Sequence, residues 1–197
     1  MPAPRIPCAG GGSCVLALVL HPGYSGYAAL DGWGLKACRT THLLHDGPKR
    51  AAMLVQLVTD LVRRYRPARV VLGIPPRDTD DTRTLRMEAV RVVTALHVLV
   101  TTRPLHQAKA ALGFRVERGT PDGLASHLAH RFFPQLIRRL TRDVSHFWYR
   151  RSAWHALAIA LTELVEFRPF AAAALVPASG HAIAAFAHAV QAAALRV

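Results

Sequence analysis

The sequence CVLALVLHPGYSGYAALD, residues 14–31, contains two short apolar runs separated by a turn. The first run, residues 15–20, is short for a helix, and its β-branched residues and sharp boundaries favour a buried strand. His21-Pro22-Gly23 ends this run, Gly26 marks the turn, and residues 27–30 form the second run. The pattern therefore predicts a β-hairpin whose first strand ends on His21. A side chain at the end of a strand reaches solvent at the rim of a sheet, where binding and catalytic groups often lie.

The composition predicts one basic domain. The chain has 197 residues, 51% of them hydrophobic, which is enough for one core. Lys and Arg together number 25 against 12 Asp and Glu, which gives a formal net charge of +13. This excess favours a polyanionic partner, which could be DNA, RNA or an anionic membrane surface. The alternative is that the arginines only reflect a GC-rich genome.

Cysteine usage and hydropathy predict a cytoplasmic protein without a membrane segment. Cys8, Cys14 and Cys38 have neither the spacing of a zinc site nor that of a disulfide framework, which fits a reducing compartment. Pro177 and Gly180 interrupt the Ala-rich C-terminal segment, which argues against a membrane span there.

The order of apolar patterns predicts an α/β fold. Residues 1–13 are rich in Pro and Gly and predict a disordered lead-in, residues 14–168 a folded domain, and residues 169–197 an Ala-rich helix or appendage. After the hairpin we expect strands near 37–43, 70–74 and 98–101, and helices near 49–66, 84–96, 107–112, 123–133 and 152–167. A strand, a helix and a second strand in succession imply a right-handed crossover, and hence a mixed sheet of about five strands flanked by helices.

Four stretches of the chain, in order over residues 14–166, resemble the RuvC-type Holliday junction resolvases of the RNase H-like superfamily. These stretches are VLALVLHPGYSGYAALD, LVTDLVRRYRPARVVLGIPP, HQAKAALG and SAWHALAIALTEL. They are similar to the family's opening hairpin, its first long helix with the following strand, its Lys-containing segment and its closing helix. The resemblance implies an RNase H-like fold, magnesium-dependent cleavage of branched DNA, and a homodimer that matches a two-fold junction.

The resemblance fails at the catalytic positions. The family holds two magnesium ions with four acidic residues, one of which is His in some members, because hard divalent ions prefer carboxylate oxygens. Here these positions carry His21, Pro75, Ser152 and His155. Proline cannot coordinate a metal, and neutral imidazole is a poor magnesium ligand. We therefore interpret the chain as a degenerate member with His21, Ser152 and His155 at vestigial catalytic positions, and expect no cofactor.

An active nuclease with relocated ligands is the main alternative. Asp78, Asp80 and Asp81 follow the second strand of the pattern and could place displaced carboxylates, and thus Mg²⁺, near the old site. The competing interpretation of this segment is a solvated loop with a helix cap.

A transition-metal site or an acid/base pair made by His21 and His155, with Ser152, is a further alternative. Two histidines without an obvious third ligand equally suit a vestigial polar cluster. Glu163 and Glu166 lie too far beyond His155 along the helix to replace it.

Basic residues predict a nucleic-acid surface. Arginines precede and follow three adjacent aromatic residues, and arginine binds phosphate while aromatic rings stack on unpaired bases. The candidates are Arg138, Arg139, Arg142, Trp148, Arg150 and Arg151. Alternatively, the aromatic residues anchor a loop and the arginines are only solvated. The resemblance adds a second phosphate-contact patch of Arg103, Lys109 and Arg115, whereas Arg63, Arg64, Arg66 and Arg69 suit an ordinary solvated helix end.

These patterns predict a RuvC-like protein that binds branched or structured DNA in recombination or repair without two-metal cleavage. The alternatives are an active crossover-junction endonuclease and a structural subunit that holds a protein partner, with the Ala-rich tail as the contact. Salt dependence separates the last from the others, because phosphate-driven binding weakens steeply with salt.

Overall fold

The computed structural model describes residues 14–43, 47–114, 123–136 and 147–166, the side chains of 147–150 excepted. The predicted lead-in, residues 1–13, and the whole Ala-rich segment, residues 169–197, lie outside these residues. Four predicted phosphate contacts also lie outside them, namely Arg115, Arg138, Arg139 and Arg142.

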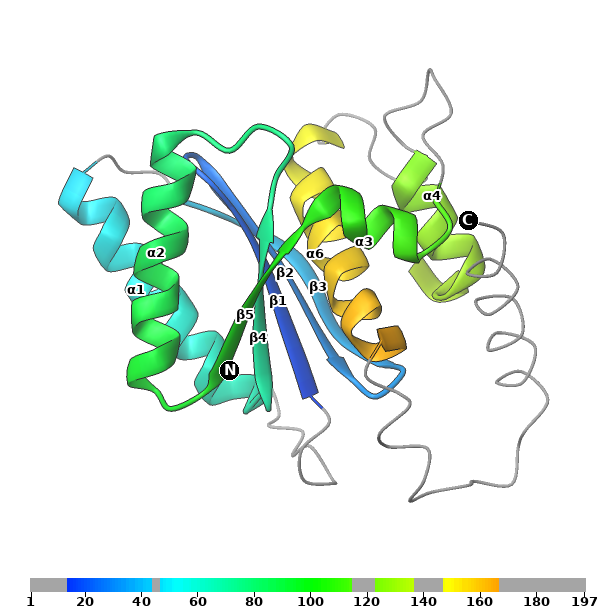
Figure 1. The fold of residues 1–197 in the computed structure, drawn as a ribbon, viewed down its shortest axis with the longest axis horizontal. Helices are drawn as coiled ribbons and strands as arrows, with labels where there is room; N and C mark the ends of the chain where they lie inside the picture. The colour runs from blue at the N-terminus through cyan, green and yellow to red at the C-terminus, as the bar shows by residue number, and fades with distance from the viewer. Residues whose placement is uncertain (1–13, 44–46, 115–122, 137–146, 167–197) are drawn as a thin grey trace, which may run out of the picture. The chain divides into compact units, whose positions relative to one another are not determined.

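The core of the fold is one mixed sheet, which confirms the predicted fold class (Figure 1). Its strands are β1 (Cys14–His21), β2 (Tyr24–Asp31), β3 (Gly34–His42), β4 (Arg69–Ile74) and β5 (Leu99–Pro104). They are ordered β3-β2-β1-β4-β5. The strand β2 is antiparallel to both of its neighbours, β1 and β3, whereas β4 and β5 run parallel to β1. The opening hairpin therefore supplies two of the three central strands.

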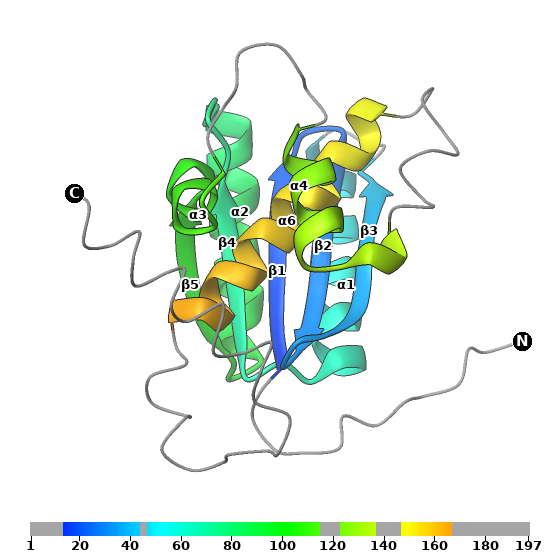
Figure 2. The same ribbon diagram turned by 90° about the vertical axis from the view of Figure 1, so that its right-hand side faces the viewer.

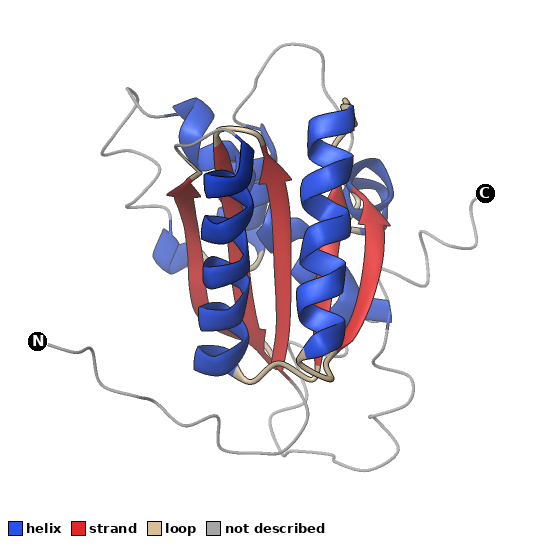
Figure 3. Cartoon of the chain, turned by 90° about the vertical axis from the view of Figure 1, so that its left-hand side faces the viewer, coloured by secondary structure: helices blue, strands red, loops and turns tan. Residues whose placement is uncertain are grey.

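Helices cover both faces of the sheet. On one face lie α1 (Gly47–Tyr65) and α2 (Asp80–Ala95), the two long helices in front of the sheet in Figure 3. On the opposite face lies α6 (Phe147–Glu166), with α3 (Leu105–Ala111), α4 (Gly123–Arg131) and the 3₁₀ turn η1 (Pro134–Leu136), as Figure 2 shows. None of the helices that the structure describes combines the length and apolar character needed to cross a bilayer.

Strand alternation divides the interior into two layers. Leu16, Leu18 and Leu20 of β1 belong to one apolar cluster with residues of α1 and α2, among them Leu54 and Val93. The residues between them in β1 therefore face α6, because successive side chains of a strand point to opposite sides. This alternation decides which strand-end side chains α6 can meet.

Small residues let α6 lie close to the sheet. A Cβ atom on Gly26 of β2 would overlap the backbone of Ser152 and Ala153, and one on Gly73 of β4 would overlap Ile159 Cδ1. Such approaches are open only to glycine, which has no side chain to displace the neighbour. Gly26 thus has a packing role in addition to the turn punctuation that the sequence predicts.

The largest difference from the predicted elements concerns α6. It begins at Phe147, five residues before the predicted start at 152, so residues 147–151 form its first turns and are not a loop. Aromatic residues and arginine are compatible with a helix, and no strong breaker separates them from the apolar part. The helix α2 also begins early, at Asp80, because Thr79 caps it: the Thr82 N–H donates to Thr79 Oγ1 at 3.3 Å.

Candidate nucleic-acid interface

The two central parallel strands bring His21 and Pro75 to the same edge of the sheet. β1 and β4 are parallel, with Val19 opposite Gly73, and His21 and Pro75 each follow two residues later. Alternation along β1 places His21 on the face of the sheet that α6 covers. Gly73 lies against Ile159 of α6, so Pro75, two residues later, belongs to the same face. The structure therefore brings together the two strand positions that the sequence predicts.

Helix α6 delivers Ser152 and His155 to this face. Ser152 Oγ lies 3.4 Å from Thr40 Oγ1 of β3, and Cys38 Sγ donates to the Ala153 carbonyl at 3.5 Å. Ser152 also packs directly against Gly26. These contacts fix the N-terminal half of α6 on the hairpin, and His155 follows one helical turn later.

His155 is the most unusual group of the site. Its side chain is 7% exposed, and within the part of the chain that the structure describes Nδ1 has no hydrogen-bond partner. Burial, followed in order by the charges of Lys109, Arg151 and His21, lowers the pKa of His155 to about 3. The imidazole is therefore neutral at physiological pH, with one nitrogen available to a ligand.

The positive charges of Lys109 and Arg151 both act on His155. Burial, followed by the charge of Arg151, lowers the pKa of both His21 and Lys109. Lys109 lies in the last turn of α3, and this helix contacts α6 because Thr162 Oγ1 donates to the Ala108 carbonyl at 3.3 Å. We call this group of four side chains, His21, Lys109, Arg151 and His155, the basic corner.

The basic corner does not fit the two magnesium ions that the fold family implies. Magnesium requires oxygen ligands in octahedral geometry, usually from carboxylates. The family positions offer two imidazoles, a proline and a hydroxyl, with Lys109 and Arg151 adding positive charge. Among the described residues, no three His, Cys, Asp or Glu side chains form a group that could hold a metal ion.

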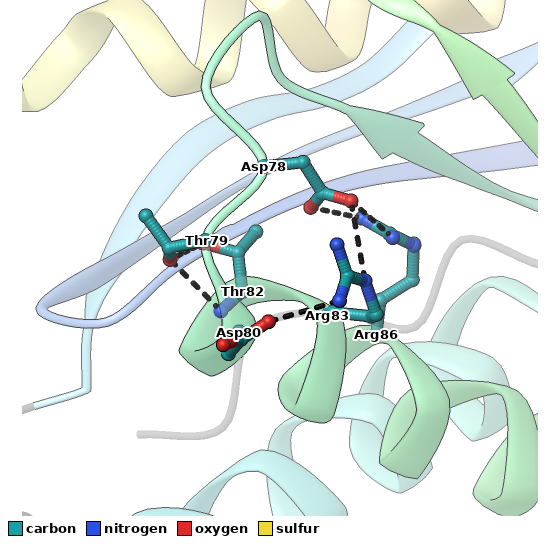
Figure 4. Close-up of polar contacts among 6 residues, drawn as sticks. All are labelled: Asp78, Thr79, Asp80, Thr82, Arg83 and Arg86. Carbon is teal, nitrogen blue, oxygen red and sulfur yellow. Dashed lines mark hydrogen bonds and ion pairs between the residues drawn. The ribbon is translucent and has the colours of Figure 1, made fainter.

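The three aspartates that follow β4, Asp78, Asp80 and Asp81, form ion pairs with arginines. Figure 4 shows three of the ion pairs, made by residues at the beginning of α2 and in the loop before it. Asp78 is the strongest case, since Arg86 donates to both of its carboxylate oxygens at 2.8 Å and thereby lowers the pKa of Asp78. The pairs are Asp78 with Arg86 and Arg83, Asp80 with Arg83 at 2.9 Å, and Asp81 with Arg50 at 3.8 Å. The three carboxylates predicted as fallback ligands therefore form ion pairs. Thr79, which lies between Asp78 and Asp80, caps α2.

A buried ion cluster at the far end of α6 was not predicted. Glu163 is 3% exposed and accepts from Arg69 Nη1 at 2.9 Å and from Arg103 Nε at 2.8 Å. The expectation of a solvated Arg69 is wrong, because this residue starts β4 and its side chain is only 20% exposed. Arg103, which the sequence predicts as a phosphate contact, donates a hydrogen bond from Nε to this buried carboxylate. The available signal was a carboxylate on the apolar face of α6, which requires buried partners.

The remaining predicted residues lie at the start of α6. Trp148 and Arg150 belong to its first turn, and Arg151 follows directly. Arg151 and His155 are four residues apart, which places them on one helix face.

Comparisons with known proteins identify the fold. No protein-family model matches the sequence, and no curated protein matches it. The similar solved structures include two of RuvC. The first is the Thermus thermophilus RuvC structure, with a TM-score of 0.51 and 14% identity, covering 77% of this chain and 97% of that one. The second is T. thermophilus RuvC in complex with a Holliday junction substrate, with a TM-score of 0.54 and 18% identity, covering 76% and 92%. At such identities the likeness shows the fold alone: the chain has the RuvC-like, RNase H-like fold.

Proposed function

We propose that the chain is a RuvC-like protein that binds branched or otherwise structured DNA, in recombination or repair, without two-metal cleavage. The observation that carries this proposal is the basic corner. The fold keeps the strand ends and the helix that would surround a metal pair, whereas the side chains there are imidazoles and cations. Such a set suits an anionic ligand and opposes a divalent cation.

Charge and fold support DNA as the ligand. The formal net charge of +13 favours a polyanion, and one structural neighbour is T. thermophilus RuvC bound to a Holliday junction. A homodimer belongs to the same proposal, because a two-fold protein matches the symmetry of a four-way junction.

The test is a titration of the full chain into a labelled four-way junction and into linear duplex of the same sequence, with and without Mg²⁺ or Mn²⁺. Binding and strand scission are read from the same samples. We expect tighter binding to the junction, loss of binding at high salt, and no nicks with either metal. Absence of binding to both DNAs would overturn the proposal.

The same assay tests the nuclease alternative. Metal-dependent nicks that disappear in the double variant D80N/D81N would assign cleavage to the acidic segment. Since no three His, Cys, Asp or Glu side chains of the described residues form a group that could hold a metal ion, we expect no such activity.

A further inference from the structure

We propose that the basic corner binds one phosphate group of the DNA directly, with Lys109 and Arg151 taking the place of the metal ions. This inference rests on the proposed function and adds the position and chemistry of one contact. It differs from the family's chemistry, in which divalent metal would stand between carboxylates and phosphate.

Three elements bring the corner together. His21 ends β1 on the face of the sheet that α6 covers. Arg151 and His155 share one face of α6, four residues apart. Lys109 comes from α3, which is attached to α6 through the 3.3 Å hydrogen bond from Thr162 to the Ala108 carbonyl. Basic side chains from three separate elements thus lie close enough to influence one another electrostatically.

The unpartnered nitrogen of His155 points independently to a ligand. A buried polar atom without a hydrogen bond costs about 1–3 kcal/mol, so native structures rarely retain one without a use. His155 is 7% exposed, and its Nδ1 has no partner among the described residues. In the tautomer that carries a proton on Nδ1, this atom can donate to a phosphate oxygen.

Electrostatics in the corner favour an anion. Burial is the largest cause of the lowered pKa of His21, of Lys109 and of His155, and the charge of Arg151 lowers all three further, so positive charges at the corner disfavour one another. A bound phosphate would reverse this effect and raise these pKa values. A divalent cation would meet the same repulsion, and we therefore expect Mg²⁺ neither to bind at the corner nor to be required there.

The direct test uses the lysines of the full chain, of which there are only three: Lys36, Lys49 and Lys109. Reductive methylation with ¹³C-formaldehyde gives a separate NMR signal for each. Inorganic phosphate, added at constant ionic strength, should shift the Lys109 signal and raise its pKa, and leave Lys36 and Lys49 unchanged. MgCl₂ should shift none of the three.

The second test measures junction affinity in matched variants. Lys109→Gln removes one charge from the corner, whereas Lys49→Gln removes one from the exposed start of α1, in the opposite helix layer. We expect a loss of about tenfold for K109Q, typical of one charged hydrogen bond, and less than about twofold for K49Q. Lys109→Arg should restore most of the affinity, and circular dichroism confirms that each variant is folded.

The outcomes separate the inference from the proposed function. Junction binding with an unmoved Lys109 signal and equal affinities of K109Q and K49Q would overturn the phosphate site and leave DNA binding intact. A phosphate-dependent Lys109 signal without any DNA binding would overturn the proposed function, and with it the assignment of the phosphate to DNA. A Lys109 signal that moves with MgCl₂ instead would overturn the inference in favour of a metal site.

Discussion

At the scale of single residues, Gly26 determines how closely α6 can approach the hairpin. The backbone of Ser152 and Ala153 occupies the space that a side chain at position 26 would need. Backbone atoms cannot rotate away as a flexible side chain can, so any Cβ at this position must move the helix or the strand.

Gly26→Ala should destabilise the protein by about 3 kcal/mol, at the upper end of the range for overpacked cores, because the added methyl group overlaps main-chain atoms. The measurement is urea unfolding followed by circular dichroism. Gly23→Ala is the matched control, since a Cβ there has no neighbour within 4 Å. Equal midpoints for the two variants would show that α6 does not contact β2 as described.

His155 should make stability fall in mild acid. Its pKa is about 3 in the folded chain and about 6.5 when unfolded, so between these values only the unfolded state takes up the proton. Stability is therefore retained above pH 6.5 and decreases as the pH falls, by about 2 kcal/mol between pH 7 and pH 5 from this residue. Lys109, Arg151 and His21 act in the same direction as burial.

The comparison with His155→Gln isolates this contribution, because glutamine keeps a polar side chain and does not titrate. Urea unfolding at pH 7 and pH 5 should show a loss that is about 2 kcal/mol larger in the wild type than in H155Q. Identical losses would mean that the imidazole is accessible to solvent.

At the scale of secondary-structure elements, α6 is attached at two separated places. Near its beginning, Ser152 meets Gly26 and Thr40, and near its end Glu163 binds Arg69 and Arg103. The second attachment connects the helix to the neighbouring parallel strands β4 and β5.

Glu163→Gln should destabilise the protein by about 3 kcal/mol, because removal of one partner leaves buried charge uncompensated. Arg69 and Arg103 are only 20% and 16% exposed, so water cannot fully replace the carboxylate. Glu88→Gln is the control: its pair with the largely exposed Arg91 should contribute less than about 1 kcal/mol. Thermal unfolding of both variants distinguishes these outcomes, and equal melting temperatures would contradict a buried role for Glu163.

The elements were predictable from local patterns, whereas the contacts between them were not. Helical spacing of Leu54, Val58 and Leu61 predicts α1, and the apolar run before Pro75 predicts β4. The positions of His21, Ser152 and His155 followed from the resemblance. The Glu163 cluster could not be predicted, because its partners come from two distant strands and no local spacing relates them.

The boundaries of elements were the weakest part of the prediction. The last helix was expected to begin at 152, yet the aromatic and basic residues from Phe147 onwards extend it by five residues. Propensity alone does not separate an exposed helical turn from a loop, since residues of this type occur in both.

At the scale of the whole molecule, the positive charge dominates. The acidic side chains of the described chain are largely used in ion pairs with its own basic residues, as at Asp31, Asp78 and Glu88. The Lys and Arg residues in excess give the protein a formal net charge of +13 and a positive electrostatic field. Such a field attracts nucleic acid irrespective of sequence.

Junction affinity should fall steeply with salt. If about four phosphates are neutralised, a slope of about −0.9 per phosphate gives a loss of roughly 150-fold between 50 and 200 mM NaCl. K109Q should reduce the slope by about one unit, because it removes one phosphate contact. Fluorescence anisotropy at five salt concentrations measures both. A flat dependence would favour the protein-interaction subunit over DNA binding.

The two attachments of α6 also determine the thermodynamics expected of the basic corner. Because the backbone that carries Arg151 and His155 is fixed before a ligand arrives, binding loses little conformational entropy. A phosphate ion buries almost no apolar surface, and this surface is the main source of a negative heat-capacity change. The enthalpy of phosphate binding by the corner should therefore be nearly constant from 10 to 35 °C in calorimetry.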